Sequence, residues 1–264
     1  MTELEKYYNK FNEDKRLKSR HGQVEFAVTT HYILNFIAYL QEKTGKKALD
    51  IIDIGAGTGA YSAFLAGRGH NVTAVELVKK NASQIALKNK AIKVKVGNAL
   101  DLKVSDEQFD IALVFGPLYH LFSHEEKLRA LTEAKRVVRR GGVVMAMFLM
   151  NDYAVIRYAF CEGNLKKCLA ENKLDEAFNC LTCNGDLYSY VRTDEINLLK
   201  NEANLTRAKL IGVDGATDYI RPVLNSLDEH DFDAFIRYQL SIAERADIVG
   251  ASSHCLDILI KNQP

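Results

Sequence analysis

The sequence predicts an α/β protein built on a doubly wound, mostly parallel sheet of seven strands. Two observations favour this fold. Between residues 48 and 149, short apolar or alternating runs take turns with segments of helical spacing, which is the pattern of β-α-β crossovers. A glycine-rich turn follows the first of these runs, where such sheets bind their ligands.

The elements follow in chain order. Five strands are expected where short, β-branched or alternating runs end at turn residues: 48–54, 71–75, 92–96, 109–115 and 143–149. Helices are expected between them at 61–67, 79–90 and 123–140, and Ser123 with Glu126 forms a capping box at the start of the last one. Later segments predict helices at 153–169, 174–181, 193–203 and 227–246, and strands at 208–213 and 255–261.

The chain shows no repeat, low-complexity tract or flexible linker, so we expect one domain with two helical additions. Residues 1–44 have helical spacing with a break at His21-Gly22, and they are predicted to form an N-terminal lid. Residues 45–264 are predicted to form the ligand-binding domain. Residues 151–190 interrupt its regular alternation and predict a helical cap insertion.

Composition limits the function classes. The chain has 264 residues, 47% of them hydrophobic, and a formal net charge of +1. This balance lacks the basic excess that is typical of nucleic-acid-binding domains. Because no apolar run of membrane-spanning length and no signal peptide are visible, we expect a cytoplasmic protein without a membrane partner. A monomer and a homodimer are both compatible with the sequence.

The five cysteines do not predict a disulfide framework, because their number is odd and no export signal precedes them. Cys180 and Cys183 have the spacing of metal ligands, but no second pair stands nearby in the sequence to complete four ligands. We therefore expect no metal and interpret the cysteines as ordinary buried thiols.

Residues 53–59 read Asp-Ile-Gly-Ala-Gly-Thr-Gly and lie between the first strand and the next helix. Glycines at this junction let the backbone approach a ligand, and the N–H groups at the helix start point toward it. The spacing is G-x-G-x-G, whereas the dinucleotide fingerprint is G-x-G-x-x-G. Asp53 is unfavourable beside a pyrophosphate and favourable beside a sulfonium or ammonium group. The alternatives are a generic dinucleotide-binding domain and a purely structural turn.

This segment resembles the first motif of class I S-adenosylmethionine-dependent methyltransferases, (D/E)-x-G-x-G-x-G. The resemblance implies S-adenosylmethionine as the cofactor and S-adenosylhomocysteine as the product, bound by a Rossmann-like sheet whose last strand is antiparallel. It places the following residues at the cofactor: Asp53, Gly55, Ala56, Gly57, Gly59, Glu76, Leu77, Asn98, Ala99 and Phe115.

Two of these residues have a clear chemical role. Glu76 ends the second strand, where a carboxylate can accept hydrogen bonds from both ribose hydroxyls; NAD sites use the same device. Residues 97–99 read Gly-Asn-Ala where the family commonly has Gly-Asp-Ala, whose acid contacts the adenine amino group. The carbonyl of Asn98 can accept the same hydrogen bond.

Residues 116–121 read Gly-Pro-Leu-Tyr-His-Leu and resemble a signature of UbiE-like small-molecule methyltransferases. The resemblance places Tyr119 and His120 near the transferred methyl group. His120 is the candidate general base, because an imidazole with an ordinary pKa near 6.5 can take a proton at neutral pH. Alternatively, Tyr119 packs beneath the cofactor and His120 caps the next helix.

The N-terminal segment has its own resemblance. Tyr7-Tyr8 and residues 13–17 and 21–26 are similar to segments that fold over the site as a lid in a subgroup of small-molecule methyltransferases. The resemblance implies that Tyr8, Arg16 or His21 reaches the cofactor or the substrate.

Together these features predict an S-adenosylmethionine-dependent methyltransferase acting on a small molecule. A methyltransferase acting on RNA or protein is one alternative, and it would show activity that falls steeply with salt. A non-catalytic module that binds S-adenosylmethionine or a nucleotide is another. The identity of the acceptor is not encoded in any motif of the cap.

Overall fold

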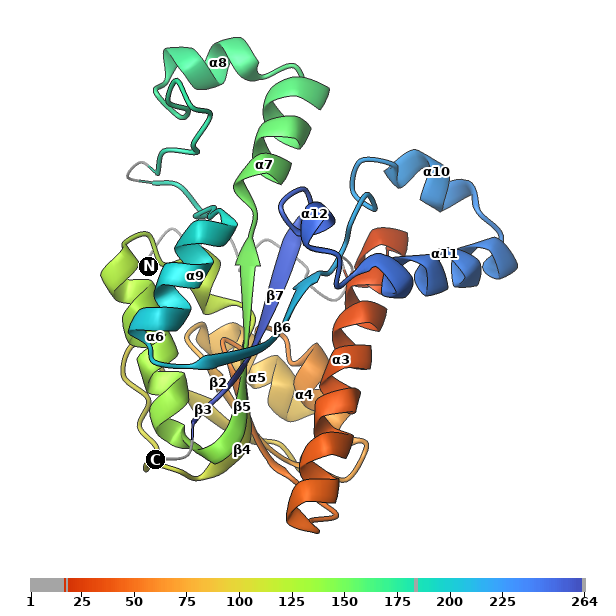
Figure 1. Cartoon of the computed structure of the whole chain (residues 1–264). Helices are drawn as coiled ribbons and strands as arrows, with labels where there is room; N and C mark the ends of the chain where they lie inside the picture. Colours follow the sequence, from red (N-terminus) through yellow and green to blue (C-terminus); the bar gives the residue numbers. More distant parts are fainter. Residues whose placement is uncertain (1–16, 18, 183–184, 263–264) are drawn as a thin grey trace.

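The computed structural model describes residues 17, 19–182 and 185–262. Its centre is a seven-stranded sheet with the order β3-β2-β1-β4-β5-β7-β6 (Figure 1). The strands are β1 Asp50–Ile54, β2 Asn71–Glu76, β3 Lys93–Val96, β4 Phe109–Val114, β5 Val138–Leu149, β6 Thr206–Gly212 and β7 His254–Ile260. Pairs from β3 to β5 are parallel, and β7 is antiparallel to both β5 and β6. The predicted fold class is confirmed.

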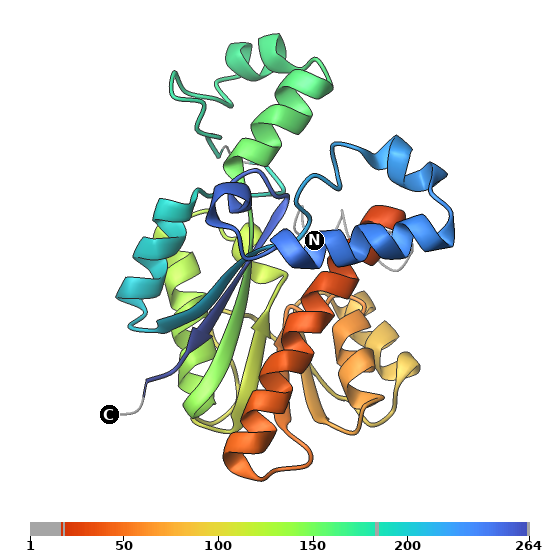
Figure 2. The ribbon, with the colours of Figure 1, turned by 45° about the vertical axis from the view of Figure 1, so that its right-hand side comes forward.

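Helices cover both faces of the sheet (Figures 1 and 2). One face carries α3 Arg20–Thr44, α4 Ala60–Ala66, α5 Lys79–Lys88 and α11 Glu229–Ile242. The other carries α6 His124–Val137 and α9 Thr193–Glu202. Because successive side chains of a strand point to opposite faces, Ile51 packs in the first layer and Ile52 in the second. This explains why the central strands are apolar throughout.

Helix α3 is a layer of the core. Its apolar side chains recur every three or four residues and are buried against the sheet: Val24, Val28, Tyr32, Ile33, Phe36, Ile37 and Leu40. Ser19 caps its start and the left-handed Gly45 its end, so the helix begins at Arg20 and the expected break at His21-Gly22 lies inside its first turn. The lid expected over residues 1–44 therefore forms part of the core from residue 20 onward, while residues 1–16 and 18 lie outside the described part.

The boundary between α6 and β5 differs from the expectation. The helix was predicted to reach residue 140, but it ends at Val137 and β5 begins at Val138. Arg139 extends along the strand and binds the carboxylate of Asp110, which also accepts from Lys46. Val138 already pairs with Phe109 of β4, so strand pairing ends the helix before the arginines.

The cap after β5 consists of α7 Asn151–Ala154, the π-helix η2 Val155–Cys161 and α8 Leu165–Ala170, and it projects beyond the carboxyl ends of the strands (Figure 1). Gly163, with φ of +71°, interrupts the helix predicted over 153–169. No helix forms at 174–181, because Asp175 accepts hydrogen bonds from the backbone of Ala177 and Asn179 and holds a turn.

Three short helices complete the described chain: η1 Pro117–Tyr119, α10 Arg221–Ser226 and α12 Ala246–Val249. Cys168 and Cys255 are buried as expected, whereas Cys161 is exposed. Cys183 lies outside the described residues.

None of the helices in the described ranges has the length and apolar character needed to cross a bilayer.

Candidate active site

The glycine-rich loop lies where the strand order reverses, between β1 and β4. Gly55, Gly57 and Gly59 all have positive φ, but they serve different contacts. A Cβ on Gly55 would lie 2.5 Å from Cδ of Pro117, and one on Gly59 would lie 2.8 Å from Cγ1 of Ile85. Gly57 has no atom within 4 Å of such a Cβ, so its open side faces the space available to a ligand.

Glu76 holds this loop in place. Its side chain is buried, with Oε2 accepting from the backbone N–H of Gly57 at 2.8 Å and Oε1 accepting from that of Val78 at 2.8 Å. Burial raises the pKa of Glu76, and these hydrogen bonds oppose the rise. A carboxylate offers about four lone-pair sites, so Glu76 can brace the loop and still accept from a ligand hydroxyl.

Asp53, the fourth residue of β1, lies beneath the same loop. It accepts a hydrogen bond from Ser62 Oγ at 2.6 Å. Burial raises the pKa of Asp53 to about 6, the bond from Ser62 opposes that rise, and the charge of Glu76 adds to it. The site thus holds two buried acids close together, which favours a cationic ligand.

Two cavities meet at the loop, and Gly55, Gly57 and Gly116 line both. The larger has a volume of about 260 Å³ and is also lined by Glu76, Leu77, Asn98, Ala99 and His120. The smaller has a volume of about 70 Å³ and is also lined by Asp53, Ala56, Phe115 and Tyr119. The structure therefore brings most of the sequence-predicted residues together, while Gly59 packs against Ile85 instead.

Asn98 is exposed at the rim of the larger cavity. Its side-chain carbonyl accepts from the backbone N–H of Leu100 at 2.9 Å. The oxygen expected to meet the adenine amino group is thus already an acceptor within the protein.

His120 lies in the wall of the larger cavity. Its Nδ1 is 2.8 Å from the carbonyl oxygen of Leu187, which fixes Nδ1 as the donor, and its ring stacks on Tyr188 with centroids 5.3 Å apart. Burial lowers the pKa of His120 to about 4, so the imidazole is neutral at pH 7. The cap of α6 is Ser123, not His120.

Of the three lid residues expected to reach the site, the structure describes one. Tyr8 and Arg16 lie outside the described residues. His21 lies in the first turn of α3, where its Nδ1 is 3.1 Å from Ser19 Oγ. Among the described residues that line the two cavities, His21 does not occur.

A buried polar cluster beside the smaller cavity was missed by the sequence reasoning. Asp214 follows β6 and His254 begins β7, and Asp214 Oδ2 accepts from the Nδ1 of His254 at 2.9 Å and from its backbone N–H at 2.6 Å. Glu25 of α3 lines the smaller cavity, and single ligand atoms of Glu25, Asp214 and His254 all lie within 4.8 Å of one another. Asp218 pairs with Arg221 next to them, at 2.7 Å.

A signal for this cluster exists in the sequence. The end of β6 and the start of the antiparallel β7 meet at the carboxyl edge of the sheet, so polar residues at these two positions can meet. Glu25 could be added only from its place on α3.

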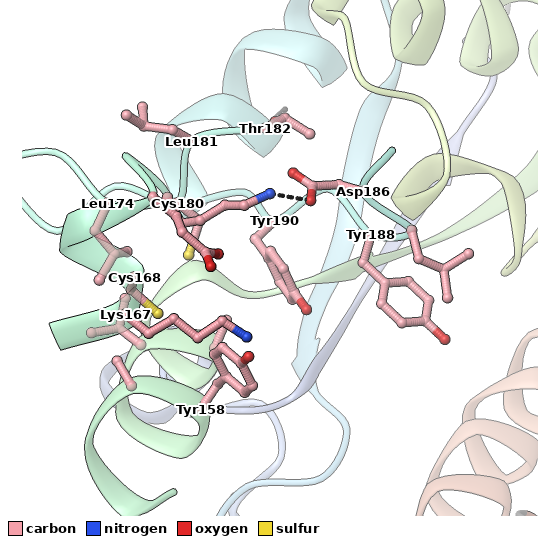
Figure 3. A pocket seen from close by; sticks show the side chains of 16 residues that line it. Tyr158, Lys167, Cys168, Leu174, Cys180, Leu181, Thr182, Asp186, Tyr188 and Tyr190 are labelled. Carbon is pink, nitrogen blue, oxygen red and sulfur yellow. Dashed lines mark hydrogen bonds and ion pairs between the residues drawn. The ribbon is translucent and has the colours of Figure 1, made fainter. Parts of the chain in front are cut away.

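The cap encloses a third cavity, of about 280 Å³, lined by Tyr158, Tyr188 and Tyr190 and by the ion pair of Lys173 with Asp186 (Figure 3). Tyr188 connects the cap to the cofactor side. Its ring contacts those of both His120 and Tyr119, at 5.3 and 6.0 Å between centroids. One layer of aromatic rings thus separates the cap cavity from the two cavities at the glycine loop.

Comparisons with known proteins agree with this geometry. Residues 52–146 match the family model described as a methyltransferase domain. No curated protein matches the sequence.

Solved structures share the fold. An S-adenosylmethionine-dependent methyltransferase of Thermotoga maritima aligns with 99% of this chain and 100% of its own, at 18% identity and a TM-score of 0.60. The N-methyltransferase NodS of Bradyrhizobium japonicum, in complex with S-adenosylhomocysteine, aligns with 99% of this chain and 100% of its own, at 11% identity and a TM-score of 0.57. An S-adenosylmethionine-dependent methyltransferase of Methanosarcina mazei aligns with 83% of this chain and 95% of its own, at 16% identity and a TM-score of 0.56.

Proposed function

We propose that this protein transfers a methyl group from S-adenosylmethionine to a small-molecule acceptor. The match of residues 52–146 to the family model described as a methyltransferase domain supports the reaction class. The observation that carries the proposal is the pair of adjoining cavities at the glycine loop. Tyr188 of the cap contacts the rings of His120 and Tyr119, which line these cavities, and Glu25 of α3 lines the smaller one.

The two cavities at the loop suit the two halves of the cofactor. We place the adenosine in the larger cavity, with its ribose at Glu76 and its base between Leu77, Asn98 and Ala99. The methionine half lies in the smaller cavity above Asp53 and Phe115. The sulfonium then lies near the glycines shared by both cavities, within the field of the buried acids.

Methyl transfer from a sulfonium is an in-line displacement, so the protein mainly has to align the nucleophile, the methyl carbon and the sulfur and to exclude water. Correct alignment can supply roughly 7–11 kcal/mol of the barrier reduction. Tyr119, beside the methionine cavity, and the cap are suited to this alignment. His120 supports it by joining η1 to the cap through Leu187.

An acceptor in the form of an RNA or a protein is the competing proposal. We would incubate the protein with methyl-labelled S-adenosylmethionine and either the small-molecule fraction or the macromolecular fraction of a cell extract, at low and high salt. Label that enters small molecules at both salt concentrations supports our proposal. Label that enters only RNA or protein and disappears at high salt would replace it. Tight cofactor binding without transfer to any fraction would favour a sensing module.

The assignment to the UbiE-like subgroup belongs to this proposal, and it rests on residues 116–121. Their placement is compatible with it: Gly116 approaches the carbonyl of Gly55 so closely that a Cβ would lie 2.8 Å from that oxygen.

A further inference from the structure

We propose that His254, oriented by Asp214, is the general base that takes a proton from the nucleophile of the acceptor. The inference rests on the proposed methyl transfer and gives the acceptor a chemical class, namely a molecule whose attacking nitrogen or oxygen carries a hydrogen. His254 replaces His120 as the candidate base, because His120 lies in the wall of the cavity in which we place the adenosine.

The first support is the pairing itself. His254 donates through Nδ1 to a carboxylate oxygen of Asp214 at 2.9 Å, and the same oxygen accepts the backbone N–H of His254 at 2.6 Å. A carboxylate on Nδ1 holds the imidazole in the tautomer whose Nε2 can accept a proton, and it stabilises the imidazolium that then forms.

Hydrogen bonds from Ser252 also hold the loop around Asp214. Ser252 Oγ accepts the backbone N–H groups of Asp214 at 2.9 Å and of Gly215 at 3.0 Å, and it donates to the carbonyl of His254. Ser252 and Asp214 are both buried. The pair is therefore preorganised by hydrogen bonds that belong to the fold.

The second support is its place beside the methionine cavity. The ring centroids of His254 and Tyr119 lie 6.5 Å apart, and the carboxylate of Glu25 lies within 4.8 Å of a His254 nitrogen. Tyr119 and Glu25 both line the smaller cavity. The imidazole thus neighbours two walls of the space in which we place the methionine half of the cofactor.

Titratable groups from several elements belong to the cluster around this imidazole. Glu25 comes from α3, Asp214 and Asp218 from the segment after β6, Arg221 from α10 and Tyr153 from α7. His21 on α3 interacts electrostatically with Asp218. Acids outnumber cations among these neighbours, so the imidazolium formed when the ring takes a proton has opposite charges beside it.

The step balances without a further reactant. The hydrogen on the acceptor nitrogen or oxygen leaves as a proton to Nε2 of His254, and the electron pair of that bond stays on the nucleophile. The nucleophile forms a bond to the methyl carbon while the bond from that carbon to sulfur breaks, and its electrons return to sulfur as the neutral thioether. The imidazolium then releases its proton to water.

The first test does not depend on knowing the acceptor. Nitrogen-15 NMR of the histidine rings in the S-adenosylhomocysteine complex at pH 8, with His254 assigned from the His254→Asn variant, should show a proton on Nδ1 and none on Nε2. A proton on Nε2, on either a neutral or a doubly protonated ring, would overturn the proposal.

The second test is kinetic and uses labelled S-adenosylmethionine with a panel of amines, phenols and alcohols. His254→Asn should lower kcat at least about 100-fold, the scale of a lost general base, while cofactor affinity measured by calorimetry changes less than about twofold. The loss of kcat at low pH in the native protein should be absent in this variant. The matched control His230→Asn alters a side chain that is 85% exposed on α11 and should keep native kcat.

A His254→Asn variant that keeps more than about a third of the native kcat would reject His254 as the base, whatever the acceptor. Failure of the native protein to methylate any member of the panel would count against the proposed function, and the NMR result would then still decide the role of His254 separately.

Discussion

Each glycine of the loop is required for a different reason. Gly59 is needed by the packing of the fold, because a side chain there meets Ile85, whereas Gly57 borders open space. The sequence motif alone gives the three glycines equal weight. The structure separates a glycine that supports stability from one that admits the ligand.

This separation predicts opposite effects of two matched substitutions. Gly57→Ala should weaken binding of S-adenosylmethionine at least about tenfold, or 1.4 kcal/mol, because the new methyl group occupies ligand space, with a loss of stability of only about 1–2 kcal/mol from the positive φ. Gly59→Ala should lose a further 1–3 kcal/mol or so through overpacking and keep most of its affinity. Calorimetry and chemical denaturation measure the two quantities. Equal effects of both variants on affinity would refute the assignment.

Asp53 predicts a pH dependence of cofactor binding. Its pKa of about 6 means that the free protein holds a proton there at pH 5, and a cationic sulfonium binds better to the ionised form. Affinity for S-adenosylmethionine should therefore rise with pH, by about tenfold from pH 5 to pH 7. S-adenosylhomocysteine, which has no sulfonium, should show a smaller rise. In Asp53→Asn the rise should be absent; its persistence would assign the titration to another group.

Among the elements, η1 and the cap are joined through His120, since its Nδ1 bonds the carbonyl of Leu187 and its ring stacks on Tyr188. The helix α3, by contrast, is held by a continuous apolar face against the sheet. One connection of the cap therefore depends on a titratable side chain, and this connection should respond to pH.

The pKa of His120 fixes the direction of that response. It falls from 6.5 in the unfolded chain to about 4 in the folded one, so between these values the unfolded state binds a proton that the native state does not. Stability should decrease as pH falls from about 6.5 to 4, by on the order of 3 kcal/mol from this group. His120→Asn, which can keep the bond to Leu187, should lose less over this range in urea titrations. If the pH dependence of stability is the same in this variant as in the native protein, the pKa of His120 does not differ between the folded and unfolded states.

The elements also show what the sequence can predict. The strands of the sheet and the glycine loop follow from local patterns, because buried parallel strands are apolar throughout and glycines mark the turn. The end of α6 does not, since Arg139 leaves the helix for a carboxylate 29 residues earlier in the chain. Nor does the pair of Asp214 with His254, which are 40 residues apart and meet only because β6 and β7 are neighbours.

For the whole molecule, the sheet places three kinds of group along one edge. The carboxyl ends of β1, β2 and β4 carry Glu76 and the glycine loop, where we place the cofactor. The end of β6 and the start of β7 bring Asp214 and His254 beside it, and the cap reaches this edge through the contact of Tyr188 with Tyr119. In our proposal, this order along the edge places a proton acceptor next to the methyl donor.

The central claim is that the glycine loop binds S-adenosylmethionine, and calorimetric titration with S-adenosylmethionine, S-adenosylhomocysteine and NAD tests it most directly. We predict micromolar binding of the first two and no binding of NAD, with affinity for both reduced by about 1–3 kcal/mol in Glu76→Ala, the scale of lost hydrogen bonds to a charged group. Binding of NAD alone would contradict the account, and unchanged affinity in Glu76→Ala would remove Glu76 from the ribose site.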